Sequence, residues 1–141
     1  MQLYRFSPIE TKEKLLEAVA YVASQTTALC RKILDKEFSI TSLTIFAHYA
    51  SEYEKLTSTL SDLGEFYNDN NGPRIALREP ISIGKNSITH LRIRRPDPYR
   101  TQVGCNDFNV ENYATFKQKY LDTHPHSLRL IERKDYEMIE F

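Results

Sequence analysis

Two stretches of the chain, residues 40–93 and residues 102–141, predict the same order of elements: a strand, a helix and two further strands. The two predicted helices match in register at three apolar positions: Tyr53 with Tyr113, Leu56 with Phe116, and Leu60 with Tyr120. Each helix therefore presents one apolar stripe that must be buried against a sheet. This doubling constrains the fold more than any other feature of the sequence. It predicts an α+β protein that contains two related units.

Residues 1–38 have no counterpart in the second unit and predict a helical segment. Three residues predict its start: Ser7 as the N-cap, Pro8 in the first helical turn, and Glu10 as the capping-box partner of Ser7. Apolar residues then recur at helical spacing. Thr26 and Thr27 leave open whether the segment is one long helix or two helices with a bend. We expect an added element that covers the sheet.

The chain is predicted to be a single domain, residues 1–141, with one module at 39–96 and the other at 101–141. Its 19 basic and 19 acidic residues cancel, so it lacks the overall basic field that gathers nucleic acid. No apolar run approaches the length of a membrane span. Cys30 and Cys105 have no metal-ligand spacing and are predicted to be small buried apolar side chains in a reducing compartment. We expect a cytoplasmic protein with neither nucleic acid nor membrane as partner.

Basic side chains follow two neighbouring strands predicted in the first unit. Arg74 and Arg78 lie in one strand, and His90, Arg92 and Arg94 lie in the next, after a predicted hairpin turn. Period-two alternation places the three residues of the second strand on one face. Two interpretations stay open for that face. It is either the solvated outer face of an antiparallel sheet or the lining of a concave pocket, where paired guanidinium groups hold a carboxylate or a phosphate.

Residues 40–95 resemble one βαβββ module of the vicinal oxygen chelate (glyoxalase-like) superfamily. Within them, the stretch NGPRIALREPI at 71–81, followed by HLRIRRPDP at 90–98, is similar to the YecM-like branch of that superfamily. The resemblance implies an α+β fold in which two βαβββ-type modules form a curled mixed sheet, or half-barrel. It also implies a ligand or a divalent metal on the concave face of this sheet.

The superfamily takes its metal ligands from the first and last strands of each module, and the chain departs from this pattern. Ser42 and Gly104 stand near the two positions where histidines are expected. The resemblance implies an acidic or amide ligand on the last strand of the first module, where the chain has His90 or Arg92, and only Glu140 keeps a family-like ligand type. One carboxylate and one histidine cannot complete a tetrahedral or octahedral site. The alternative role for Glu140 is an ion pair with one of the arginines of the first module.

We therefore predict a metal-free module, without a cofactor, that binds a small anionic metabolite on the concave sheet face. The predicted ligand-binding residues are Arg74, Arg78, His90, Arg92, Arg94 and Glu140, and none is predicted to be catalytic. The alternative is a divalent-metal-dependent lyase, isomerase or dioxygenase of the vicinal oxygen chelate class, in which His90 and Glu140 share the metal ion. A third hypothesis is a structural or regulatory homodimer.

Overall fold

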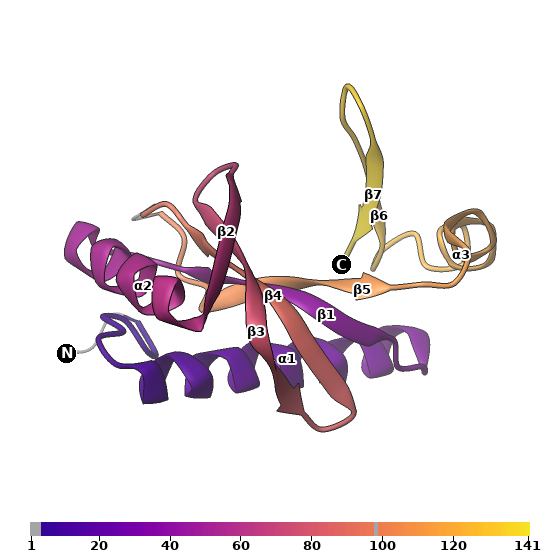
Figure 1. Ribbon diagram of the computed structural model, residues 1–141. Coiled ribbons are helices and arrows are strands. Elements are labelled where there is room, and N and C mark those ends of the chain that lie inside the picture. The colour runs from indigo at the N-terminus through magenta and orange to yellow at the C-terminus, as the bar shows by residue number, and fades with distance from the viewer. Residues whose placement is uncertain (1–3, 98) are drawn as a thin grey trace.

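The computed structural model of the chain describes residues 4–97 and 99–141 (Figure 1). Within these residues the elements follow in the order α1 (Lys12–Leu34), β1 (Ser39–Phe46), α2 (Ala50–Leu63), β2 (Gly64–Asp69), β3 (Pro73–Ile83), β4 (Asn86–Arg94), β5 (Gly104–Asn109), α3 (Tyr113–Tyr120), β6 (Arg129–Glu132) and β7 (Glu137–Glu140). This confirms the predicted α+β class and the added helix before the first unit.

Five strands form a mixed sheet in the order β2-β3-β4-β1-β5. β1 runs parallel to β4, whereas the pairs β2–β3, β3–β4 and β1–β5 are antiparallel. The second unit adds only β5 to this sheet, at the edge beside β1. Its last two strands, β6 and β7, pair with each other in a separate two-stranded sheet, which stands apart from the first sheet in Figure 1. The second unit thus repeats the predicted order of a strand, a helix and two strands, but it contributes only one strand to the five-stranded sheet.

The N-terminal segment forms one continuous helix that begins later than the sequence predicts. Thr11 is the N-cap and accepts a hydrogen bond from the backbone N–H of Lys14 at 3.1 Å, so the predicted start at Ser7 and Pro8 is wrong. Ser7 is instead buried and bonded to His48. Thr26 lies within this one continuous helix, and its hydroxyl donates to the helix carbonyl of Val22 at 2.9 Å.

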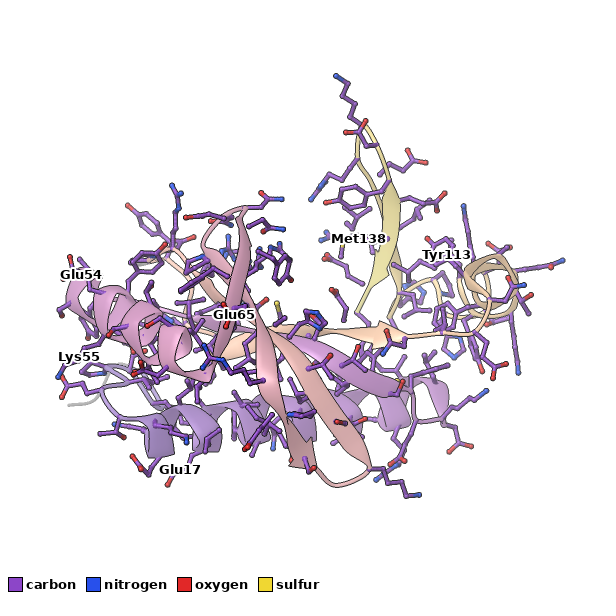
Figure 2. All side chains as sticks on the ribbon, in the orientation of Figure 1. Glu17, Glu54, Lys55, Glu65, Tyr113 and Met138 are labelled. Carbon is purple, nitrogen blue, oxygen red and sulfur yellow. The ribbon has the colours of Figure 1, made fainter. Side chains whose placement is uncertain are left out.

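Both long helices pack on one face of the five-stranded sheet. The core there combines buried residues of α1 and α2 with alternate residues of the central strands: Leu15, Val19, Leu56, Leu60, Leu43, Ile45, Ile75, Leu91 and Ile93. The outward sides of these helices are charged, and Figure 2 shows Glu17 on α1 and Glu54 and Lys55 on α2 pointing away from the sheet. The sheet therefore has one face covered by helices and one that these helices leave free.

Strand β2 was not predicted, because the sequence after Gly64 lacks the alternation that marks a half-buried strand. The structure explains this: from Glu65 to Asp69 every residue is exposed. β2 is an edge strand that pairs only with β3. Period-two patterning requires one face to be buried, and this strand buries neither.

The N-terminal segment is attached to α2 through a buried side chain, Glu52, which is 1% exposed. Its two carboxyl oxygens accept the backbone N–H groups of Ile9 at 2.6 Å and of His48 at 2.7 Å. The His48 ring bonds to the hydroxyl of Ser7 at 2.6 Å and stacks on Tyr4 with ring centroids 4.0 Å apart. His48 is thus a structural residue. Glu52 anchors the segment that precedes α1.

The β6–β7 hairpin contacts α3 through one carboxylate, that of Glu137. This carboxylate accepts hydrogen bonds from Lys117 Nζ at 2.9 Å and from the Tyr113 hydroxyl at 3.0 Å. A second apolar cluster lies beneath, where Cys30, Tyr120 and Leu128 are buried together. The hairpin is therefore held by an exposed polar contact and a small core.

The contact between hairpin and helix is expected to depend on pH. Lys117, and next Tyr113, lower the pKa of Glu137 by hydrogen bonding, and the same contact raises the pKa of Lys117. The lowered carboxyl pKa contributes stability that is lost as pH falls through the folded pKa, and the raised lysine pKa contributes stability that is lost as pH rises through it. We expect the contact to be fully formed only between about pH 5 and pH 10.

Thermal unfolding of a Glu137→Gln variant tests this expectation. The variant should unfold at a lower temperature than the wild type at neutral pH, and the difference should vanish at about pH 2, where Glu137 is protonated in both states. Glu17→Gln, on the exposed side of α1, serves as control and should show no pH-dependent difference. An undiminished difference at low pH would contradict the assignment.

No helix within the described residues is both long and apolar enough to cross a membrane.

Candidate functional site

The face of the sheet opposite α1 and α2 is polar and carries three arginines. In the strand register, Arg74 on β3 lies opposite Arg92 on β4, Arg92 lies opposite Thr44 on β1, and Thr44 lies opposite Cys105 on β5. Arg94 lies two residues further along β4, opposite Phe46. Side chains at these positions share one face because β-strand side chains alternate. We call Arg74, Arg92 and Arg94 the arginine cluster.

Arg74 and Arg92 are direct neighbours across the β3–β4 pair. Arg92 Nε donates to the Thr44 hydroxyl at 3.1 Å. Arg74 Nε is buried and has no hydrogen-bond partner among the described residues. The pKa of Arg92 is lowered, first by burial of the Arg92 guanidinium and next by the positive charge of Arg74. Since arginine stays protonated in proteins, Arg74 and Arg92 place two positive charges at neighbouring positions, partly out of water.

Arg94 extends the cluster toward the end of β4. Its guanidinium carbon lies 5.0 Å from the centre of the Phe46 ring, a cation–π distance. Phe46 is buried beneath it, 6% exposed. The ring holds the guanidinium close to the sheet surface, so Arg94 remains beside Arg92.

Tyr67 and His90 border the cluster on the next row of the sheet. The register of β2 against β3 shifts between Phe66 and Asn68, and a bulge of this kind re-aims a side chain. The ring of Tyr67 meets the ring of His90 edge to face, with centroids 5.8 Å apart. Tyr67 keeps 52% of its surface exposed. The cluster is thus flanked by an accessible aromatic ring that sequence reasoning did not assign to the site.

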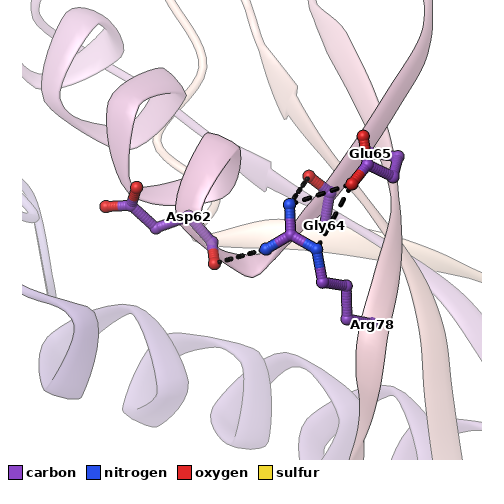
Figure 3. A network of polar contacts seen from close by, with 4 residues as sticks. All are labelled: Asp62, Gly64, Glu65 and Arg78. Carbon is purple, nitrogen blue, oxygen red and sulfur yellow. Dashed lines mark hydrogen bonds and ion pairs between the residues drawn. The ribbon is translucent and has the colours of Figure 1, made fainter.

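Arg78 does not belong to the cluster, so its predicted place beside the other arginines is wrong. The register of β3 against β4 shifts between Ala76 and Ile81, and Arg78 instead turns toward the end of α2 (Figure 3). There it bonds to the Glu65 carboxylate at 2.9 Å and to the backbone carbonyl of Asp62 at 3.1 Å. Its charge is therefore balanced within the fold.

Glu140 is paired with an arginine outside the arginine cluster. Glu140 lies on β7 and forms an ion pair with Arg129 on the neighbouring strand β6. The expected ion pair with an arginine of the first module is therefore wrong. Figure 2 shows Met138 on the same strand, well away from Glu65 at the edge of the large sheet. Among the described residues, no group of three or more His, Cys, Asp and Glu side chains could hold a metal ion.

The acidic residues nearest to the cluster are mostly paired with other cations. Glu65 is paired with Arg78, and Asp69 with Arg95 at 3.3 Å. Asp107 lies on β5, one row away from Arg92. No ion pair joins an acidic side chain to the arginine cluster within the part of the chain that the structure describes. The cluster therefore carries three positive charges without an ion-paired carboxylate among the described residues, and the charge of Asp107 acts on Arg92 from the neighbouring row.

Cys105 is exposed as a residue, which corrects the prediction that it is buried. Its thiol nevertheless lies against Thr44 and Arg92, and burial of the thiol raises its pKa despite the lowering effect of Arg92. A raised thiol pKa leaves little of the reactive thiolate at neutral pH. Cys30 is buried and likewise unpaired. Cys105 thus lines the site as a polar neighbour.

The three residues of the arginine cluster are half-buried on the sheet face that α1 and α2 leave free. Five hollows of the described surface are lined by other residues, and the largest of these lies between α1 and the β3–β4 turn. Of the two interpretations from the sequence, the geometry thus fits an exposed sheet face better than an enclosed concave pocket. The face still brings together four of the six predicted residues, Arg74, His90, Arg92 and Arg94.

Comparison of the chain with protein-family models, with curated proteins and with solved structures finds no match. The resemblance to the vicinal oxygen chelate superfamily therefore stays a prediction. The function has to be inferred from the site itself.

Proposed function

We propose that the protein is a binding module that recognises an anionic group, a phosphate or a carboxylate, on the free face of its sheet. The observation that carries the proposal is the pair Arg74 and Arg92, which occupy paired positions on the neighbouring strands β3 and β4 and are both without an ion-paired carboxylate among the described residues. Such a pair costs free energy through repulsion and partial desolvation. An anion that bridges the two groups would offset both costs.

The chemistry of the two side chains fits this role. A guanidinium presents parallel N–H donors that match the oxygens of carboxylates and phosphates. Arg92 is already oriented by its hydrogen bond to Thr44, so it loses less conformational entropy on binding. Arg74 Nε is a buried donor that lacks an acceptor, and buried donors normally have one. Arg94 adds a third positive charge on the same face.

Thermal shift with inorganic phosphate tests the proposal. At a phosphate concentration of about 100 times Kd the melting temperature should rise by about 9 °C, relative to chloride at equal ionic strength. Arg74→Gln and Arg92→Gln should each remove most of this rise, because each leaves one unpaired guanidinium.

Arg78→Gln is the matched control. Arg78 lies on the same strand as Arg74 but is bonded to Glu65 and to the end of α2, so the phosphate-induced rise should survive its replacement. A rise that is lost equally in all three variants would indicate non-specific charge effects. No rise with phosphate, and none with a di- or tricarboxylate, would reject anion binding at this face.

A further inference from the structure

The shape of the free sheet face restricts which anions it can bind tightly. Small-molecule sites are usually concave and enclose most of their ligand, whereas none of five hollows on the described surface contains a residue of the arginine cluster. A small metabolite on this face would keep much of its surface in water. A ligand that extends over several strands would contact the cluster at more than one point. The open geometry therefore favours an extended anion.

The backbone positions of the three arginines extend in two directions on this face. Those of Arg74 and Arg92 lie on adjacent strands, roughly 5 Å apart, and those of Arg92 and Arg94 lie along one strand, roughly 7 Å apart. One bound phosphate can therefore bridge the first pair while a second phosphate of the same chain reaches Arg94. A polymer with regularly repeated phosphates satisfies all three arginines at once.

An aromatic ring lies beside these charges. Tyr67 is 52% exposed, and its edge-to-face contact with His90 fixes the ring while leaving it accessible. Exposed aromatic rings next to arginines on an open sheet provide stacking surfaces for unpaired bases. The hydroxyl of Ser42 and the amide of Asn68 lie at neighbouring register positions and offer hydrogen bonds to base edges.

We propose that the free face of the sheet binds single-stranded nucleic acid, with phosphates on the arginine cluster and a base stacked on Tyr67. This inference rests on the proposed anion binding and specifies its ligand. It differs from the expectation drawn from net charge, because the neutral total conceals a local imbalance: Glu65 and Asp69 are paired with Arg78 and Arg95, which leaves the cluster free.

Fluorescence anisotropy with a labelled mixed-sequence RNA of about ten nucleotides, a site size typical of single-strand binders, tests the inference. Tyr67→Ala should weaken binding about ten-fold through the loss of one stacked base, whereas Tyr67→Phe should keep the wild-type affinity. Arg92→Gln should weaken binding and reduce the slope of log K against log salt by about 0.7. Arg78→Gln should leave both quantities unchanged. Because Tyr67 is exposed, urea unfolding should show that its variants are as stable as the wild type.

A duplex of the same sequence separates the ligand types. It should bind more weakly than the single strand, since its bases are not available for stacking on Tyr67. Equal binding of the duplex, or unchanged affinity of Tyr67→Ala, would overturn the assignment. If phosphate stabilises the protein but the RNA does not bind, only this inference fails. If neither binds, the proposed anion binding fails with it.

Discussion

Replacing Glu52 with alanine is expected to destabilise the protein by about 4 kcal/mol. Both carboxyl oxygens of Glu52 accept backbone N–H groups, from Ile9 and from His48, at a position that is 1% exposed. Without them, two buried donors lose their acceptors, and each unpaired buried group costs about 1–3 kcal/mol. Glu52→Gln keeps one acceptor oxygen and should cost about half as much.

Urea unfolding followed by circular dichroism measures this loss. Glu54→Ala is the matched control, because Glu54 lies two residues further along α2 with its side chain exposed (Figure 2), and such changes usually stay within about 0.5 kcal/mol. Equal effects at the two positions would show that the Glu52 carboxylate does not anchor the N-terminal segment.

Glu52 also shows where sequence reasoning reaches its limit. The helical period places Glu52, four residues before Leu56, on the buried side of α2 and Glu54 on the exposed side, but it does not identify what the Glu52 carboxylate binds. The burial of Glu52 depends on a segment more than forty positions away in the chain, which brings the N–H of Ile9 to its carboxylate. Local patterns do not encode a contact of that kind.

The candidate site was predictable to the extent that it follows from alternation along one strand. His90, Arg92 and Arg94 share a face, as the period of two requires. The pairing between strands was harder to predict, because the register of β3 against β4 is continuous at Arg74 but shifts between Ala76 and Ile81. This shift brings Arg74 opposite Arg92 and leaves Arg78 without a partner position on β4, and its side chain bonds instead to Glu65 on β2. The bulge that turns Tyr67 toward His90 left no clear signal in the sequence.

Glycine at position 72 links the fold to this site, and its replacement with alanine is expected to destabilise the protein by about 3–4 kcal/mol. Gly72 has a φ of +109°, which side chains of L-residues rarely adopt. A Cβ there would overlap the backbone carbonyl of Ile93 and would lie 3.3 Å from the Cα of Arg94. The neighbouring atoms are backbone of β4, so they cannot rotate away.

Gly84 provides the control for backbone conformation without crowding. It also has a positive φ, of +58°, but a Cβ would meet nothing within 4 Å, so Gly84→Ala should cost only about 1–2 kcal/mol. The difference between the two variants in urea unfolding therefore isolates the close approach of the β2–β3 turn to β4. Because that approach sets the position of Arg94 relative to Arg74, Gly72→Ala should also weaken phosphate binding under conditions where it remains folded. Equal stability of the two variants would show that β4 can move away from the turn, and that the spacing of the arginine cluster does not depend on it.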